Sequence, residues 1–193
     1  GHLDAVTGCA FRLGSHVLVT GSKDRSLRVW NAAEGTFMET MYGHLSDVTS
    51  VDSLGGERAV SASVDRTVRH WKIHLETHSQ LGGSHTAPID CIRMLTDDLF
   101  VSGSQDGVLA LWNASRRKPV SVVTDAHGPN HWIESVAVVR YSDVLATGSD
   151  DGFVRVWRLT SGKRAVIHDE PIAALPVRGH VTGLAMGPTT GRI

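Results

Sequence analysis

The chain has 193 residues, of which 19 are Lys or Arg and 20 are Asp or Glu, so its formal charge is −1. Hydrophobic residues make up 41% and charged residues 20%, a composition that excludes a disordered tail and a collagen-like chain. The balanced charge also weighs against a non-specific polyanion binder, which carries a basic excess. No apolar run of about 18 residues is present to cross a bilayer as a helix, so we expect no membrane partner.

The two cysteines, Cys9 and Cys91, are too few for a disulfide framework or a four-cysteine zinc site. We expect both to be small buried hydrophobic side chains. This cysteine usage favours a reducing intracellular compartment.

An internal repeat runs through the chain, and tryptophan marks it. Each repeat contains a Trp, with an Asp six residues before it, a Ser or Thr four residues before that Asp, and a His further upstream. We call each set a tetrad. The four tetrads are His2, Thr20, Asp24 and Trp30; His44, Ser61, Asp65 and Trp71; His85, Ser102, Asp106 and Trp112; and His127, Thr147, Asp151 and Trp157.

Strands are predicted around each tetrad in chain order. In the first repeat the segment VTGSKDRSLRVW reads as a strand, a tight turn on the aspartate and a second strand with alternating apolar residues. Strands over Val6–Phe11 and Phe37–Tyr42 complete the unit. Four short strands in about 40–45 residues are typical of one blade of a WD40 β-propeller. The sequence therefore predicts an all-β WD40 propeller.

The repeat predicts four blades, at about 1–42, 43–84, 85–126 and 127–178. A fifth blade starts at 179–193, with Val181–Met186 as its first strand. An arc of four blades leaves two apolar end faces, so we expect a fragment of a larger, seven-bladed ring. Two long connections, 127–132 and 169–178, are either binding loops or tolerated insertions.

The tetrad residues have a structural role in this interpretation. The indole N–H of a buried Trp needs an acceptor, which the hydroxyl supplies, and the His links that hydroxyl to the Asp. A Ser, His and Asp set could also suggest a hydrolase. However, catalytic triads do not recur in every blade, and no G-x-S-x-G motif is present. We therefore expect no catalytic residues, no cofactor, no metal and no small-molecule substrate.

Four stretches of the chain resemble the WD-repeat subunits of the U3 small nucleolar ribonucleoprotein. They are GHLDAVTGCAFRLGSHVL with DRSLRVWN and ETMYGH (1–44), IDCIRM with FVSGSQDGVLALWNASRRKPV (89–120), AHG with WIESVA (126–137), and DVLATGSDDGFVRVW (143–157). The resemblance covers most of residues 1–160 and implies that about two blades precede the first residue.

This resemblance implies a function. Proteins of that kind are not enzymes. They bind the U3 small nucleolar RNA at its box B/C element, beside a small kink-turn-binding protein, and act in small-subunit ribosomal RNA processing in the nucleolus. The implied partners are U3 RNA and small-subunit processome proteins. A generic protein-interaction WD40 scaffold, such as an adaptor, fits the neutral charge equally well and stays open as the alternative.

Two groups of basic residues are candidates for RNA or partner contact, because RNA phosphates are bound by Lys and Arg. The outer loop, Arg116, Arg117 and Lys118, is predicted between the third and fourth strands of its blade. The turn set, Lys23, Arg25 and Arg66, flanks the aspartate turns. Ordinary solvated loops would explain both groups as well. Three further residues are more scattered: Arg140, Lys163 and Arg164.

Three other signals are weighed and set aside. His70, His74 and His78 recur every four residues, but a strand position for His70 rules out one helical metal face. His127 and His131 lack a third ligand. Asn113-Ala114-Ser115 is a glycosylation sequon at a strand end, where coincidence is the simpler explanation in an intracellular protein.

Overall fold

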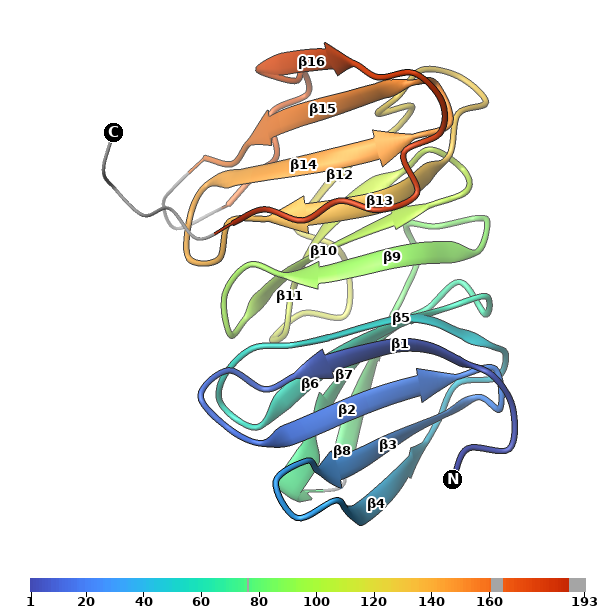
Figure 1. The fold of residues 1–193 in the computed structure, drawn as a ribbon. Helices are drawn as coiled ribbons and strands as arrows, with labels where there is room; N and C mark the ends of the chain where they lie inside the picture. Colours follow the sequence, from blue (N-terminus) through green and yellow to red (C-terminus); the bar gives the residue numbers. More distant parts are fainter. Residues whose placement is uncertain (76, 161–164, 188–193) are drawn as a thin grey trace.

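The computed structural model describes residues 1–75, 77–160 and 165–187, and these form four antiparallel sheets of four strands each (Figure 1). The predicted all-β class is confirmed. One short 3₁₀ helix, η1 (Ile73–Leu75), follows β7. Across the described ranges, no helix has the length and apolar character needed to cross a membrane.

The sheets follow the chain, each with its four strands in sequence order. Blade one contains β1 (Val6–Phe11), β2 (Val17–Ser22), β3 (Ser26–Asn31) and β4 (Thr36–Tyr42). Blade two contains β5 (Val48–Ser53), β6 (Arg58–Ser63), β7 (Val68–Lys72) and β8 (Thr77–Leu81). Blade three contains β9 (Ile89–Met94), β10 (Leu99–Ser104), β11 (Leu109–Asn113) and β12 (Ser121–Val123). Blade four contains β13 (Ile133–Val138), β14 (Val144–Ser149), β15 (Phe153–Arg158) and β16 (Ala173–Pro176).

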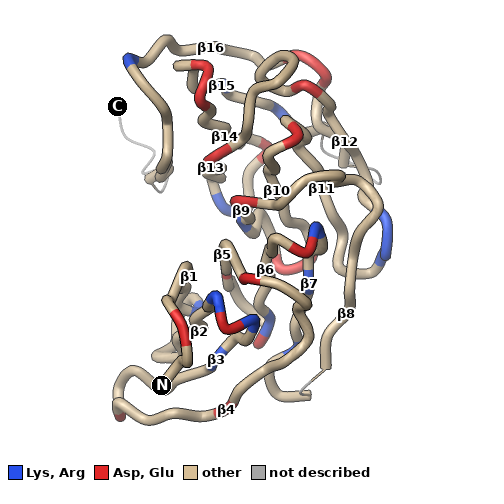
Figure 2. The backbone as a smooth tube through the Cα atoms, turned by 90° about the vertical axis from the view of Figure 1, so that its right-hand side faces the viewer, with Lys and Arg blue, Asp and Glu red and all other residues tan. Residues whose placement is uncertain are grey.

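The blades pack side by side in chain order, with the inner strands β1, β5, β9 and β13 on one side and the outer strands on the other (Figure 2). One hydrophobic cluster fills each of the three spaces between neighbouring blades. Because side chains alternate along a strand, each inner blade contributes one face to the cluster before it and the other face to the cluster after it. Trp71, Trp112 and Trp157 each pack on the preceding blade and are at most 2% exposed.

Blade one has no preceding blade among these residues, so the face of its sheet that points away from blade two is open. Trp30 is only partly buried and packs edge-on against Phe37, with ring centroids 5.5 Å apart. Phe11 and Phe37 are 57% and 50% exposed. Cys9 points to the same face, so the expectation that it is buried is wrong; Cys91, between blades, is buried as expected.

The prediction of a fifth-blade strand over Val181–Met186 is also wrong, since no strand forms over these residues. A strand needs a partner backbone, and the described residues provide none beside this segment. Its first residue nevertheless lies where an inner strand would start. Ser135 Oγ donates to Val181 O at 2.8 Å, and a Cβ placed on Gly148 would collide with Val181, as one on Gly103 would collide with Ile133.

Candidate functional site

Each tetrad lies within one blade and links the segment before the inner strand to the second strand, the third strand and the turn between them. In blade two the Trp71 indole donates to Ser61 Oγ at 2.8 Å. His44 Nε2 lies 2.7 Å from the same Ser61 Oγ, and its Nδ1 lies 2.9 Å from Asp65 Oδ2. The backbone N–H of Leu45 also donates to Asp65 Oδ2, which fixes the connection before β5.

The same arrangement recurs in blades one and four. In blade one Thr20 Oγ1 lies 2.9 Å from the Trp30 indole nitrogen and 2.8 Å from His2 Nε2, and His2 Nδ1 lies 2.9 Å from Asp24. In blade four the corresponding distances from Thr147 Oγ1 to Trp157 and His127 are 2.8 and 2.7 Å, and His127 Nδ1 lies 3.0 Å from both Asp151 oxygens.

Blade three differs at one bond. His85 Nε2 and the Trp112 indole both contact Ser102 Oγ, at 2.7 and 2.8 Å. His85 Nδ1 is 3.8 Å from Asp106 Oδ1, too far for a direct hydrogen bond. The hydroxyl of Ser104 lies between them, 2.6 Å from His85 Nδ1 and donating to Asp106 Oδ1.

In the tetrad of blade two, the electrostatics favour an ionised Asp65 beside a neutral His44. Burial opposes ionisation of Asp65, but hydrogen bonds from His44, Thr67 and Leu45 outweigh it and hold its pKa well below the usual range. Burial lowers the pKa of His44 despite the neighbouring carboxylate. Ser61 is fully buried and already accepts from Trp71, so a substrate could not reach its hydroxyl. This geometry supports the blade rather than chemistry.

The turn set lies where the second and third strands of blades one and two meet. Lys23, Arg25 and Arg66 are all exposed. Arg25 and Arg66 have φ of 69° and 65°, and blades three and four place Gly107 and Gly152 at the same turn position with φ of 72° and 76°. A left-handed backbone costs a side-chain-bearing residue about 1 kcal/mol, so two blades carry arginine where glycine would be relaxed.

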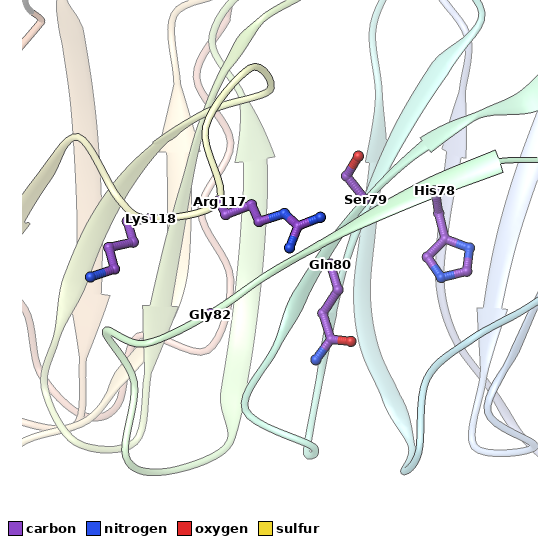
Figure 3. A pocket seen from close by; sticks show the side chains of 6 residues that line it. All are labelled: His78, Ser79, Gln80, Gly82, Arg117 and Lys118. Atoms are coloured by element: carbon purple, nitrogen blue, oxygen red, sulfur yellow. The ribbon is translucent and has the colours of Figure 1, made fainter.

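The outer loop lies between β11 and β12, with Arg116, Arg117 and Lys118 all exposed. The N–H of Gly82, just after β8, donates to Arg117 O at 3.4 Å and ties this loop of blade three to blade two. Between them lies an open groove of about 550 Å³, the outer groove, lined by His78, Ser79, Gln80, Gly82, Arg117 and Lys118 (Figure 3). The structure therefore separates the two basic groups, one on turns and one beside an outer strand.

Comparison with known proteins identifies the repeat. A family model described as WD domain, G-beta repeat matches residues 1–31, 35–72, 77–113 and 118–158. The chain belongs to the WD40 repeat family. Each match after the first spans the outer strand of one blade and the first three strands of the next, and all four end one residue after a tetrad tryptophan.

Several relatives of this WD40 chain carry U3 in their names. It is 37% identical over 199 residues to the U3 snoRNP-associated protein-like EMB2271 of Arabidopsis thaliana, covering 96% of this chain and 41% of that protein. It is 40% identical over 86 residues to U3 small nucleolar RNA-interacting protein 2 of Mus musculus, covering 40% of this chain and 18% of that one.

Solved structures agree. A structure titled "Structure of U3-55K" superposes with a TM-score of 0.91 at 39% identity, covering 96% of this chain and 58% of the other. One titled "Crystal structure of RRP9 WD40 repeats" gives 0.90 with the same identity and coverage. The chain thus spans less than two thirds of the length of these relatives.

One group of interacting residues escaped the sequence reasoning. Arg69 is 5% exposed, and its guanidinium donates to His78 Nε2 and, at 3.3 Å, to Gln80 Oε1. The His78 ring lies 4.6 Å from that of Trp71. Burial and then Arg69 lower the pKa of His78, so it accepts as a neutral ring. The signal was present in the two-residue spacing of His78 and Gln80 on one strand face.

The histidines weighed as metal ligands have separate partners. His70 stacks on Phe100, with ring centroids 6.2 Å apart. His74, which lies in η1, is 2.6 Å from Glu57. His131 contacts Asp150 at 3.3 Å.

In the connection 127–132, Trp132 is 47% exposed, and its N–H donates to Asp150. The segment 169–178 contains β16. Asn113 Oδ1 accepts from Ser115 N at 2.9 Å, and Arg140 contacts Asp52 at 3.5 Å. Lys163 and Arg164 lie outside the described residues.

Proposed function

We propose that this WD40 chain is part of a non-catalytic scaffold that associates with the U3 small nucleolar RNA and acts in small-subunit pre-rRNA processing. Its partners are then U3 RNA and small-subunit processome proteins, and the protein is located in the nucleus, within the nucleolus. One observation carries the proposal: proteins with U3 in their names match 96% of the chain, at 37% identity by sequence and 39% by structure. The match therefore includes the loops between the repeat motifs as well as the motifs.

The geometry supports a scaffold role. The hydroxyl and imidazole groups of the tetrads are buried between strands and used for structure, so the chemistry-bearing residues of the repeat serve the fold. A rigid arc with exposed turns and outer strands offers surfaces for binding.

The turn set and the outer loop are the proposed surfaces for contact with RNA or with a partner protein. Arg25 and Arg66 occupy a turn position that favours glycine, which points to a use for the charge outside the fold. Arg116, Arg117 and Lys118 extend from a loop anchored at Arg117 O. Phosphate contacts of this type weaken steeply with salt.

The test is crosslinking of the full-length protein to RNA in cells, followed by sequencing. Enrichment of U3 RNA is expected. Recovery of a dominant protein partner without RNA would favour the alternative, a generic interaction scaffold.

Charge reversal then assigns the surface. Lys23→Glu, Arg25→Glu and Arg66→Glu form one variant, and Arg116→Glu, Arg117→Glu and Lys118→Glu form the other. A variant that removes RNA contacts is expected to lower U3 recovery about tenfold while its melting temperature stays unchanged. Undiminished recovery with a variant excludes that surface from RNA binding.

A further inference from the structure

The outer strand of blade two has an unusually open edge. Each of the outer strands β4, β8, β12 and β16 pairs on one side only. Proteins normally blunt such edges with short strands, prolines, charges or bulges. β12 has three residues, β16 ends in Pro176, and β4 contains Glu39 and a register shift against β3. β8 has five residues in continuous register, and Thr77–Leu81 includes no proline and no Asp, Glu, Lys or Arg.

The direction of the backbone groups along this edge can be read from two hydrogen bonds. Ile73 N donates to Glu57 O on the β6 side of β7, so by alternation the N–H groups of Val68, His70 and Lys72 face β8. Their register partners in β8 are Leu81, Ser79 and Thr77. The residues between them, His78 and Gln80, therefore direct their N–H and C=O groups outward. Gly82, the next residue of that series, donates its N–H outward to Arg117 O.

The side chains of the same two residues are held in place. Arg69 binds both His78 and Gln80, and the His78 ring packs beside Trp71. The edge is thus fixed before any partner arrives, which lowers the entropy cost of binding.

Positive charge faces this edge from the neighbouring blade. Figure 3 shows the Arg117 side chain extending from its loop towards β8, with Lys118 on the same loop. The described residues that line the outer groove include no Asp or Glu. A partner in the groove therefore meets a row of backbone donors and acceptors on one wall and cations on the other.

We propose that β8 accepts an extended acidic segment of a partner protein as an added strand. The backbone of that segment pairs with His78 and Gln80, and its carboxylates face Arg117 and Lys118. Strand addition of this kind takes affinity from main-chain hydrogen bonds and specificity from neighbouring side chains. The proposal goes beyond U3 association and stands on blade two and the outer loop alone.

An extended peptide fits this groove better than RNA. Single-stranded RNA is held by aromatic stacking along its bases as well as by cations. Among the described residues that line the groove, His78 alone has an aromatic ring, and that ring is already packed beside Trp71.

The test measures binding of a labelled nine-residue peptide, alternating Glu with Val or Thr, to the full-length protein by fluorescence anisotropy. Gln80→Pro removes the outward N–H and leaves the backbone hydrogen bonds to β7 in place, because proline is tolerated on an open edge. Gln80→Ala is the matched control, since it loses the same side chain and keeps the N–H. Arg117→Glu reverses the facing charge, and Lys23→Glu is its control on a distant turn.

Affinity is expected to fall about tenfold for Gln80→Pro and for Arg117→Glu, and to change less than about threefold for both controls. Replacing Glu by Lys in the peptide should abolish binding. In the wild-type protein, hydrogen exchange at the His78 and Gln80 amides should slow when the peptide binds, a readout that does not depend on any variant folding.

Three results would overturn the proposal. They are equal affinities for the Pro and Ala variants, equal binding of the Lys peptide, and unchanged exchange at the two amides. A uridine nonamer that binds wild type, loses affinity with Arg117→Glu and ignores Gln80→Pro would assign the groove to phosphate instead. If Lys23→Glu lowers U3 recovery and leaves peptide binding intact, the surface that binds RNA is distinct from the outer groove.

Discussion

The tetrads of blades one and two have nearly the same hydrogen bonds in different surroundings. The Trp indole lies 2.9 Å from its hydroxyl in blade one and 2.8 Å in blade two, and each His lies 2.9 Å from its Asp. Yet Trp71 is 2% exposed against blade one, whereas Trp30 is partly open and contacts Phe37 of its own sheet. The hydrogen-bond network is therefore a property of one blade, and its burial comes from the blade before.

Replacing the tryptophan should give the largest difference between the two blades. Trp71→Ala removes a fully packed side chain from the space between blades and should cost about 4 kcal/mol, while Trp30→Ala, which removes a side chain that is already partly exposed, should cost about 2 kcal/mol. Chemical denaturation of the full-length protein measures both. Equal losses would mean that another part of the full protein covers Trp30 as completely as blade one covers Trp71.

The second comparison is between two interfaces. Position 29 between blades one and two is Val, and the matching position 70 between blades two and three is a buried His. Its Nε2 has no hydrogen-bond partner, and burial, then Arg58 and Lys72, lower the pKa of His70 to about 4, while Asp98 acts the other way.

His70 should therefore make stability depend on pH. The unfolded chain takes up a proton near pH 6.5 and the folded chain does so only near pH 4, so stability falls as pH drops through this range, by up to about 3 kcal/mol. His70→Leu, which copies Leu111 of blade three, should remove this part of the pH dependence. Denaturation curves at pH 7 and pH 4.5 check it, and an unchanged slope in the variant would contradict the assignment.

The hydroxyl of the tetrad provides a smaller contrast. Ser61→Ala leaves the Trp71 N–H and His44 Nε2 without their shared partner in a dry site and should cost about 2 kcal/mol. Thr20 lies in the blade without a preceding blade and is 8% exposed, against 0% for Ser61, so Thr20→Ala should cost less, about 1 kcal/mol. The difference between the two melting temperatures reflects the burial of the hydroxyl, reduced by the methyl group that Thr20→Ala also removes. A larger loss for Thr20→Ala than for Ser61→Ala would contradict the effect of burial.

Much of this fold follows from the sequence because the repeat reports the same pattern four times. The turn aspartates and the Trp-terminated strands predict each hairpin, and the six-residue spacing of Asp65 and Trp71 predicts which side chains belong together. What failed depends on neighbours. Cys9 is exposed because no described blade covers it, and residues 181–186 form no strand because no partner strand lies beside them.

The surface features were the least predictable from the sequence. The outer groove joins Gln80 to Arg117, which lie in different blades, and no spacing within one repeat relates them. The Arg69 contacts with His78 and Gln80 depend on strand pairing between β7 and β8. In the sequence, His78 shares a four-residue spacing with His70 and His74, whereas on a strand the residue on its own face is Gln80.

The smallest expected effect tests the one tetrad that departs from the others. Ser104 relays the contact between His85 and Asp106, and burial of Asp106 is outweighed by hydrogen bonds that lower its pKa. Ser104→Ala should cost about 1 kcal/mol at pH 7 and raise the pKa of Asp106, because a donor to its ionised form is lost. Since a lowered carboxyl pKa adds stability above about pH 4 and loses it below, the cost should shrink as pH falls towards 3.

Ser63→Ala is the matched control, because Ser63 donates to Ser46 O while His44 contacts Asp65 directly, and its cost should not change with pH. The free energy of unfolding of the wild type and of both variants is measured as a function of pH. If Ser104 relays the contact, the Ser104→Ala curve approaches the wild-type curve as pH falls and the Ser63→Ala curve does not. If Ser104→Ala only removes a backbone contact, its curve runs parallel to that of the wild type.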